Sequence, residues 1–250
     1  MAIQKGDFIR LSYTGRFDNG RTFDTTDEEL AKAEGIFNTQ GLYGGDVIIV
    51  GAGHTIAGLD EALEGKEIGS TDSVEVPPEK GFGLSNPKLI KTLSITKFEN
   101  KKAYPGMNVE IEGRRGVVTR VIGRKVSVDF NSPMAGKTVT YEFTIQELVE
   151  GDLKKVQGLL SLYTGIRDME VEVEDGIAMI SIPTNLTFNQ RWLMVKNKIA
   201  NEIMKYVDLK EVQFIEKVAA EPEISAETIE AAVAEAAAPE TEEAEEAAEN

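Results

Sequence analysis

The sequence predicts an α+β protein made of several short β segments, a few helices and an acidic C-terminal tail. Three observations predict it. Residues 8–13 alternate apolar and polar side chains, which is typical of a half-buried strand. Helical spacing of apolar residues appears in 55–65 and again in 188–207. After residue 218 the composition becomes mostly Ala and Glu. A chain of 250 residues, 41% of them hydrophobic, is long enough for two or three small cores.

The N-terminal elements are expected to begin with a hairpin. The strand at 8–13 is followed by Asn19-Gly20, a pair that readily adopts the positive φ angles of a tight turn. Residues 27–35 show no strong periodicity, and we expect a surface excursion there before a strand at 47–50.

One short helix is expected at 55–65, where Gly65 is suited to end it in a left-handed conformation. Its apolar face consists of Ile56, Leu59, Ala62 and Leu63. A strand at 72–76 should then stop at Pro77-Pro78, because proline lacks the N–H that a central strand needs.

A small all-β insert is predicted for residues 87–137. Short β-like runs at 108–112, 115–121 and 125–130 are separated by Gly113 and Gly123. Alternation returns in 138–148, with Phe143 and Ile145 on one face, so the first unit should resume there and end near residue 150.

Residues 151–218 are predicted to form an independent αββαβ unit. A helix to about Tyr163, a hairpin of 169–173 with 178–182, the long helix and a last strand at 212–215 make up this unit. The buried face of the long helix should hold Trp192, Val195, Ile199, Ile203 and Val207, which makes Trp192 a core residue.

The tail at 219–250 is predicted to be disordered. It has eleven Glu and no Lys or Arg, and the rest of the chain carries 27 basic against 32 acidic residues. The net charge of −16 therefore belongs mostly to the tail.

Four motifs, in this order and at these separations, resemble the FKBP-type peptidyl-prolyl isomerases. They are Tyr13-Thr14-Gly15-Arg16, Gly20-Arg21-Thr22-Phe23-Asp24, the glycine-rich stretch Val50 to Gly65, and Val76-Pro77-Pro78-Glu79-Lys80-Gly81-Phe82-Gly83. The resemblance implies an antiparallel half-barrel sheet with one short helix over residues 1–86 and 138–150. It also implies catalysis of X-Pro isomerisation.

The resemblance further implies the site residues. Tyr13, Phe23, Ile56, Leu59, Phe82 and Phe143 would line a proline pocket with Thr55 beside them, and Asp24 would orient Tyr13 at its edge. The backbone N–H of Ile56 would receive a substrate carbonyl. Such a dry pocket suits the reaction, because a twisted amide is less polar than a planar one.

Three residues depart from the family pattern. Leu59 stands where many members have a tryptophan, Phe82 where many have a tyrosine, and Asp46 where an apolar or aromatic side chain is common. These departures imply a roomier, weaker pocket that retains activity, and they leave its affinity for macrolide inhibitors open. His54 is interpreted as a solvent-exposed loop residue.

The insert resembles the chaperone domain of SlyD-type members through Val128 to Thr138, with Ser132 where His commonly precedes the proline. This implies capture of unfolded or nascent polypeptides by exposed apolar side chains. The candidates are Met107 and Met134, with Ile90, Leu93 and Tyr104. The alternative is that these side chains fill the insert's own core. Residues 151–218 resemble the C-terminal region of long archaeal members, and a free sheet edge there makes a homodimer possible.

Composition excludes several classes of function. With no Cys and a single His we expect no disulfide, metal site or cofactor. No apolar run is long enough to span a membrane, and the start lacks a signal-peptide pattern, so we expect a cytoplasmic protein.

Two other functions stay open. One is a holdase chaperone with a vestigial isomerase site. The other is an RNA-binding small barrel, since 88–137 holds eleven basic and four acidic residues, although no aromatics interleave with the charges.

Overall fold

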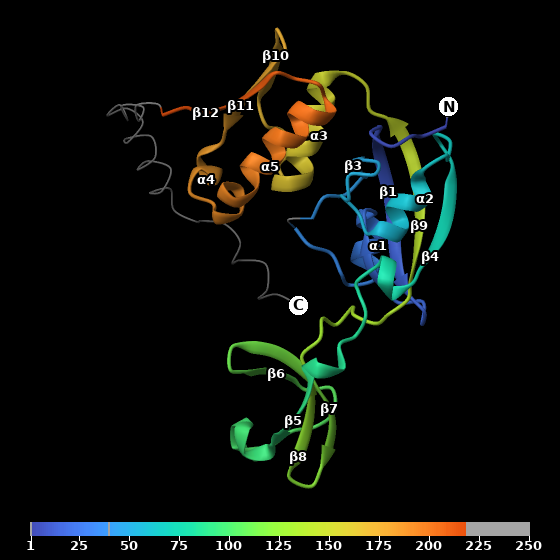
Figure 1. Ribbon diagram of the computed structural model, residues 1–250, viewed down its shortest axis with the longest axis vertical. Helices are drawn as coiled ribbons and strands as arrows, with labels where there is room; N and C mark the ends of the chain where they lie inside the picture. The colour runs from blue at the N-terminus through green and yellow to red at the C-terminus, as the bar shows by residue number, and fades with distance from the viewer. Residues whose placement is uncertain (1, 40, 219–250) are drawn as a thin grey trace, which may run out of the picture.

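A computed structural model describes residues 2–39 and 41–218 and contains three β-sheets (Figure 1). The first sheet and its helices form what we call the first unit. The insert is the four-stranded sheet between β4 (Thr71–Val76) and β9 (Val139–Leu148), and the third unit follows β9. The tail predicted to be disordered, 219–250, lies outside the described residues. The arrangement is α+β, as predicted.

The first unit is built around two long antiparallel strands, β1 and β9. The sheet order is β2-β1-β9-β4, and β3 pairs with the first half of β1. The elements are β1 Phe8–Phe17, β2 Thr22–Thr25, α1 Glu28–Ala33, β3 Asp46–Ile49, α2 Ala57–Leu63, β4 Thr71–Val76 and β9 Val139–Leu148. Alternate residues of β9 face a core that also holds Leu59 and Leu63 of α2, so α2 covers one face of the sheet.

The excursion expected at 27–35 contains a second short helix, α1, so the prediction of one helix in this unit is wrong. Asp27 caps α1, with its side chain accepting the Leu30 N–H at 3.0 Å, and Ala31 is buried. Six residues are too few to show a helical period, and the cap was the available signal.

The insert contains the strands β5 Ile90–Ser94, β6 Asn108–Ile111, β7 Arg114–Ile122 and β8 Lys125–Asp129, in the order β5-β8-β7-β6. Short 3₁₀ segments lie at Pro78–Lys80, Pro87–Leu89, Ile95–Lys97 and Glu99–Lys101. The insert's own core is centred on Phe98, Val118, Val126 and Val128. Figure 1 shows the insert below the rest of the molecule, connected by two chain segments.

Hydrogen bonds tie these two connecting segments together. The Gly136 N–H donates to the Gly83 carbonyl at 2.8 Å. The Asn131 side chain accepts from the Asn86 N–H at 2.8 Å and donates to the Asn86 carbonyl at 3.1 Å. The insert is therefore attached through a bridged pair of segments rather than through two separate linkers.

The third unit is a three-stranded sheet with helices packed against it. Its elements are α3 Asp152–Thr164, β10 Val171–Glu174, β11 Ile177–Ile182, α4 Thr184–Thr187, α5 Gln190–Tyr206 and β12 Glu211–Glu216. β10 and β11 form the predicted hairpin, and β12 pairs with β11 in parallel. Trp192 is 3% exposed and its ring meets Phe214 edge-on at 5.1 Å, so its assignment to the core is confirmed.

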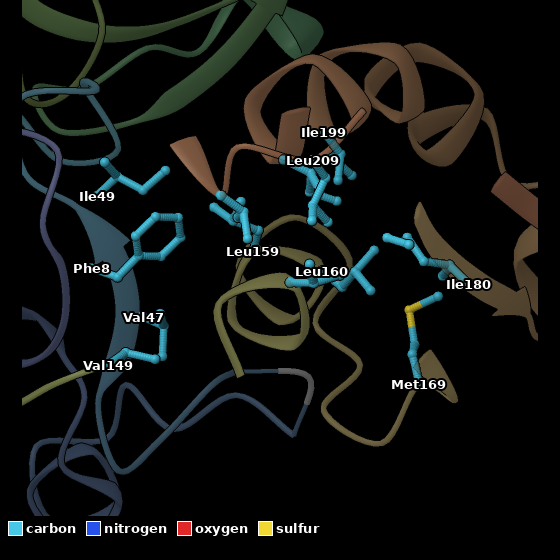
Figure 2. Close-up of a cluster of buried hydrophobic side chains, with 14 of the residues drawn as sticks. Phe8, Val47, Ile49, Val149, Leu159, Leu160, Met169, Ile180, Ile199 and Leu209 are labelled. Carbon is cyan, nitrogen blue, oxygen red and sulfur yellow. The ribbon is translucent and has the colours of Figure 1, made fainter. Parts of the chain in front are cut away.

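The sequence predicted that the third unit is independent of the first. The structure shows instead that the two units share a buried core. One buried cluster contains Phe8, Val47 and Ile49 of the first sheet together with Leu159 of α3 and Ile199 of α5. Figure 2 shows Phe8 and Ile49 directed toward Leu159. The apolar face of α3 therefore buries against the first sheet as well as against its own unit, which helical periodicity alone does not distinguish.

Candidate active site

Six of the residues predicted for the site line a single cavity of about 290 Å³ in the first unit. They are Tyr13, Asp24, Thr55, Ile56, Leu59 and Phe82. These residues come from four parts of the first unit, namely β1, β2, the entry to α2 and the segment after β4. Segments far apart in the sequence thus meet where the motif order places them.

An aromatic cluster lies along one side of the cavity, and its Tyr13, Phe82 and Tyr141 line it. Phe23, which was predicted to line the pocket, packs against these rings but lines the neighbouring cavity instead. The Phe23 ring meets Phe82 edge-on at 5.9 Å and Tyr141 edge-on at 5.8 Å, and Tyr141 lies 5.8 Å from Tyr13. Gly15 allows this packing, since a Cβ there would lie 2.6 Å from the Phe23 ring. Edge-to-face contacts of this kind hold the rings in defined orientations.

Phe143 does not line the cavity, and Tyr141 takes that place. Phe143 is 2% exposed, packs inside the first core and pairs with Tyr13 across the sheet. Tyr141, two residues earlier on β9, pairs with Gly15 and reaches the cavity. Both side chains lie on the inner face of β9, so alternation could not choose between them and only the strand register does.

The turn before α2 presents the Ile56 backbone to the cavity. The Asp60 side chain accepts the Gly51 N–H at 2.8 Å and the Gly53 N–H at 3.2 Å, which holds the turn against α2. Ile56 is the N-cap residue of α2, and within the described chain its N–H donates no hydrogen bond. A free N–H at a helix start is a ready donor for a carbonyl group.

The side chain of His54 is buried, so the assignment of His54 as an exposed loop residue is wrong. Its side chain is 2% exposed, and its Nε2 lies 3.1 Å from Glu202 Oε2 of α5. The Nδ1 atom accepts the Ile49 N–H at 3.1 Å, so Nε2 carries the proton and donates to Glu202. Glu202 also accepts the Tyr163 hydroxyl at 2.8 Å. The partner is 148 residues away, which no local pattern reveals.

Two carboxylates share the hydroxyl of Tyr13. The hydroxyl donates to Asp46 Oδ2 at 3.4 Å. Burial raises the pKa of the Asp24 carboxyl above its ordinary value, and hydrogen bonds from the Thr25 backbone and the Tyr13 hydroxyl partly oppose that rise. Burial raises the pKa of Asp46 from 3.8 to about 6, with the nearby Asp24 adding to the rise. Burial likewise raises the pKa of Tyr13 and Tyr141, so both remain neutral hydroxyls at physiological pH.

The raised pKa of Asp46 predicts a pH dependence of stability. The folded protein holds this proton up to about pH 6, whereas the unfolded chain holds it only up to about pH 3.8. The free energy of unfolding should therefore decrease as the pH rises from about 3.8 to about 6, and should then level off. Asp46→Asn removes the ionisable group, so the variant should be more stable than wild type near neutral pH. Solvent screening limits this increase in the free energy of unfolding to about 1–2 kcal/mol. Urea unfolding at about pH 5 and about pH 7.5 measures it.

The exposed Asp18 provides the control, since Asp18→Asn should leave the pH dependence of wild type unchanged. Asp24, Tyr13, Arg10 and Arg167 also act on Asp46 and are retained in both variants. Parallel stability curves for wild type and Asp46→Asn would contradict this account of Asp46.

The third unit contributes one wall of the cavity through Leu162 of α3, which sequence reasoning missed. Leu59 is 1% exposed and forms part of the floor. Thr55 Oγ1 and Asp46 Oδ1 are buried, and neither finds a hydrogen-bond partner among the described residues. The cavity therefore combines apolar walls with two unsatisfied oxygens.

The remaining predicted binding residues lie outside the cavity. Met107 is half-buried against the insert core, as its alternative interpretation proposed, and Met134 packs against the first core. Leu93 also joins the insert core, whereas Ile90 and Tyr104 are exposed, at 45% and 64%. Exposed Ile122, at 57%, was not predicted.

Residues 2–39 and 41–218 include no helix long and apolar enough to cross a membrane. The same residues contain no group of three or more His, Cys, Asp or Glu side chains arranged to hold a metal ion.

Comparison with family models gives two matches. Residues 1–100 match the model described as FKBP-type peptidyl-prolyl cis-trans isomerase, and residues 152–219 match the model described as FKBP26_C-terminal.

Curated proteins similar to the chain include one from an archaeon and two from bacteria. The chain is 33% identical over 148 residues to a short-type peptidyl-prolyl cis-trans isomerase of Methanocaldococcus jannaschii, covering 58% of this chain and 94% of that protein. It is 30% identical over 145 residues to a probable FKBP-type 16 kDa peptidyl-prolyl cis-trans isomerase of Pseudomonas fluorescens, covering 55% and 85%. It is 28% identical over 165 residues to the FKBP-type isomerase SlyD of Treponema pallidum, covering 64% and 86%.

Proposed function

The chain belongs to the FKBP-type peptidyl-prolyl cis-trans isomerase family, and from this we propose that the cavity bounded by Tyr13, Ile56, Phe82 and Tyr141 is where it isomerises X-Pro bonds of folding polypeptides. The single observation that carries the proposal is the convergence of the four motifs on one aromatic-walled cavity. Residues 1–86 with 138–150 form the isomerase domain in this proposal. Residues 87–137 are the insert domain and 151–218 the C-terminal domain.

The proposed mechanism depends on solvent exclusion. A planar amide is stabilised by resonance, which the twisted state loses, and the barrier is about 18–20 kcal/mol. The rings of Phe82 and Tyr141, held in place by Phe23, exclude water from the bound amide, which costs the polar planar form more than the less polar twisted form. The residues supply shape and dryness, with no nucleophile in the scheme.

Hydrogen bonds position the substrate in this scheme. The Ile56 N–H would donate to a substrate carbonyl, and it is supported by the turn that Asp60 holds. Tyr13, neutral and oriented by Asp46 and Asp24, would contribute a second polar contact at the edge. Each tenfold in rate requires about 1.4 kcal/mol, so a dry wall and one aimed hydrogen bond account for several orders of magnitude.

We further propose that the insert binds unfolded segments and delivers them to the cavity. Supporting this, Phe82 of the cavity lies on the segment that enters the insert, and Met134 lies on the segment that leaves it. The hydrogen bonds between the two segments keep the insert close to the cavity. Exposed Ile90, Tyr104 and Ile122 give the insert an apolar surface for polypeptide.

Two changes to the chain should distinguish isomerase activity from chaperone activity. Asp24→Asn should lower the turnover of a proline peptide by about tenfold, because Tyr13 loses one of its two carboxylates, and should leave suppression of aggregation intact. Replacing 87–137 by a short glycine-rich link should leave turnover of the proline peptide intact and should lower the suppression of aggregation. A protease-coupled proline assay and light scattering of an unfolded client measure the two activities.

A vestigial site is the competing function, and it predicts that Asp24→Asn changes neither activity. The exposed Asp18 supplies a matched control, since Asp18→Asn should have no effect in either assay. The homodimer through 151–218 and the cytoplasmic location stay predictions; β10 and β12 are the two edges of the third sheet.

A further inference from the structure

A second cavity, of about 700 Å³, adjoins the proposed proline cavity. Four residues line both of them, namely Tyr13, Asp24, Asp46 and Leu162. One wall of this flanking cleft is the loop before β3, including Leu42 and Tyr43. The other wall belongs to the third unit, including Asn185 and Arg191. A polypeptide leaving the proline cavity on this side enters the flanking cleft.

The two walls are held in place by contacts between the units. The shared core fastens α3 to the first sheet (Figure 2). The Arg167 guanidinium donates to the Tyr43 carbonyl, which ties the loop before β3 to the third unit. The Glu202–His54 hydrogen bond fastens α5 to the turn that presents Ile56. The width of the cleft is therefore set by packing between the units.

The chemistry of the cleft suits a peptide backbone. Where the two cavities join, Asp46 Oδ1 is buried and has no partner among the residues that the structure describes, so it is available to accept a backbone N–H. Farther along, exposed Asn185 and Arg191 offer donors for carbonyl groups.

We propose that the third unit completes the substrate site, and that the flanking cleft binds the segment of unfolded polypeptide adjoining the proline on one side. This rests on the proposed isomerase function of the neighbouring cavity and adds a binding region to it. The occupant is the substrate chain because the cleft is continuous with that cavity through four shared residues. The third unit thus contributes to selection of substrates by length.

The test compares a short X-Pro peptide with the same peptide extended by several residues, either before or after the proline. One of the two extensions should raise kcat/KM by about tenfold over the short peptide. Arg191→Glu and, more weakly, Asn185→Ala should reduce the ratio of long-peptide to short-peptide kcat/KM. Lys210→Glu is the matched control. Lys210 belongs to the same unit but lies beside Gly176, away from the cleft, so this variant should retain the wild-type ratio.

A photo-crosslinking group at the end of the favoured extension identifies the contact. Crosslinks to residues 185–191 or 162–166 are expected. Crosslinks confined to 87–137 would assign the gain to the insert and overturn the inference. Equal kcat/KM for short and extended peptides would also overturn it while leaving isomerase activity established. No turnover of any peptide would instead reject the proposed function.

Discussion

Phe82→Ala should lower kcat/KM for a short proline peptide by about a hundredfold, which corresponds to about 2.7 kcal/mol of transition-state stabilisation. Phe82 is half-buried, lines the proposed proline cavity and contacts Phe23 edge-on. Removing its ring admits water to the bound amide, and the planar form then regains the solvation that the cavity denies it. The measurement is a proline isomerisation assay with circular dichroism to confirm the fold.

Two variants make this result specific. Phe130→Ala removes another half-buried phenylalanine from the insert core and should leave short-peptide turnover near wild type. Phe82→Tyr keeps the ring and adds a hydroxyl, so it should retain activity, because the proposed mechanism requires only an apolar wall at this position. Full activity in a folded Phe82→Ala protein would show that solvent exclusion by this ring is not part of the reaction.

Gly158→Val should lower the free energy of unfolding by about 3 kcal/mol. Gly158 lies in α3, where it is buried, and even a Cβ there would lie 2.4 Å from Val47 Cγ1 of β3. The larger side chain forces α3 away from the first sheet and opens the shared core around Phe8 and Ile49. Urea unfolding followed by Trp192 fluorescence measures the loss.

A second substitution tests the cause. Val47→Ala removes the two methyl groups that meet the new side chain, so Gly158→Val with Val47→Ala should be more stable than the sum of the single changes allows. Lys154→Val, exposed on the same helix, controls for the helix propensity of valine. Strict additivity of Gly158→Val and Val47→Ala would refute the packing between α3 and β3 as the source of the loss.

The elements that sequence predicted well are those whose signal is long or closely spaced. The long helix was predicted because Trp192, Ile199 and Ile203 repeat over several turns, and all three are buried. The glycine-rich stretch before Ile56 could be assigned because its spacing to Phe23 and Phe82 is a joint pattern. The six-residue helix α1 carries no comparable period, so it was missed.

The errors at the candidate site come from information that a one-dimensional pattern does not contain. Tyr141 and Phe143 occupy the same face of β9, and only the pairing with Gly15 or Tyr13 decides which reaches the cavity. His54 is buried by a helix that begins at residue 190, and Leu162 reaches the cavity from α3. Contacts between units depend on docking, which periodicity within each unit cannot specify.

The pairing of β1 with β9 has a consequence for the order of events during synthesis. Ile9 pairs with Leu148, whereas β7 and β8 of the insert are joined by a tight turn. The ribosome must therefore release nearly the whole first unit and all of the insert before the central sheet closes, while the insert's hairpins gain their contacts as they emerge. The insert, which we propose binds unfolded chains, would then be the earliest part of this protein to fold.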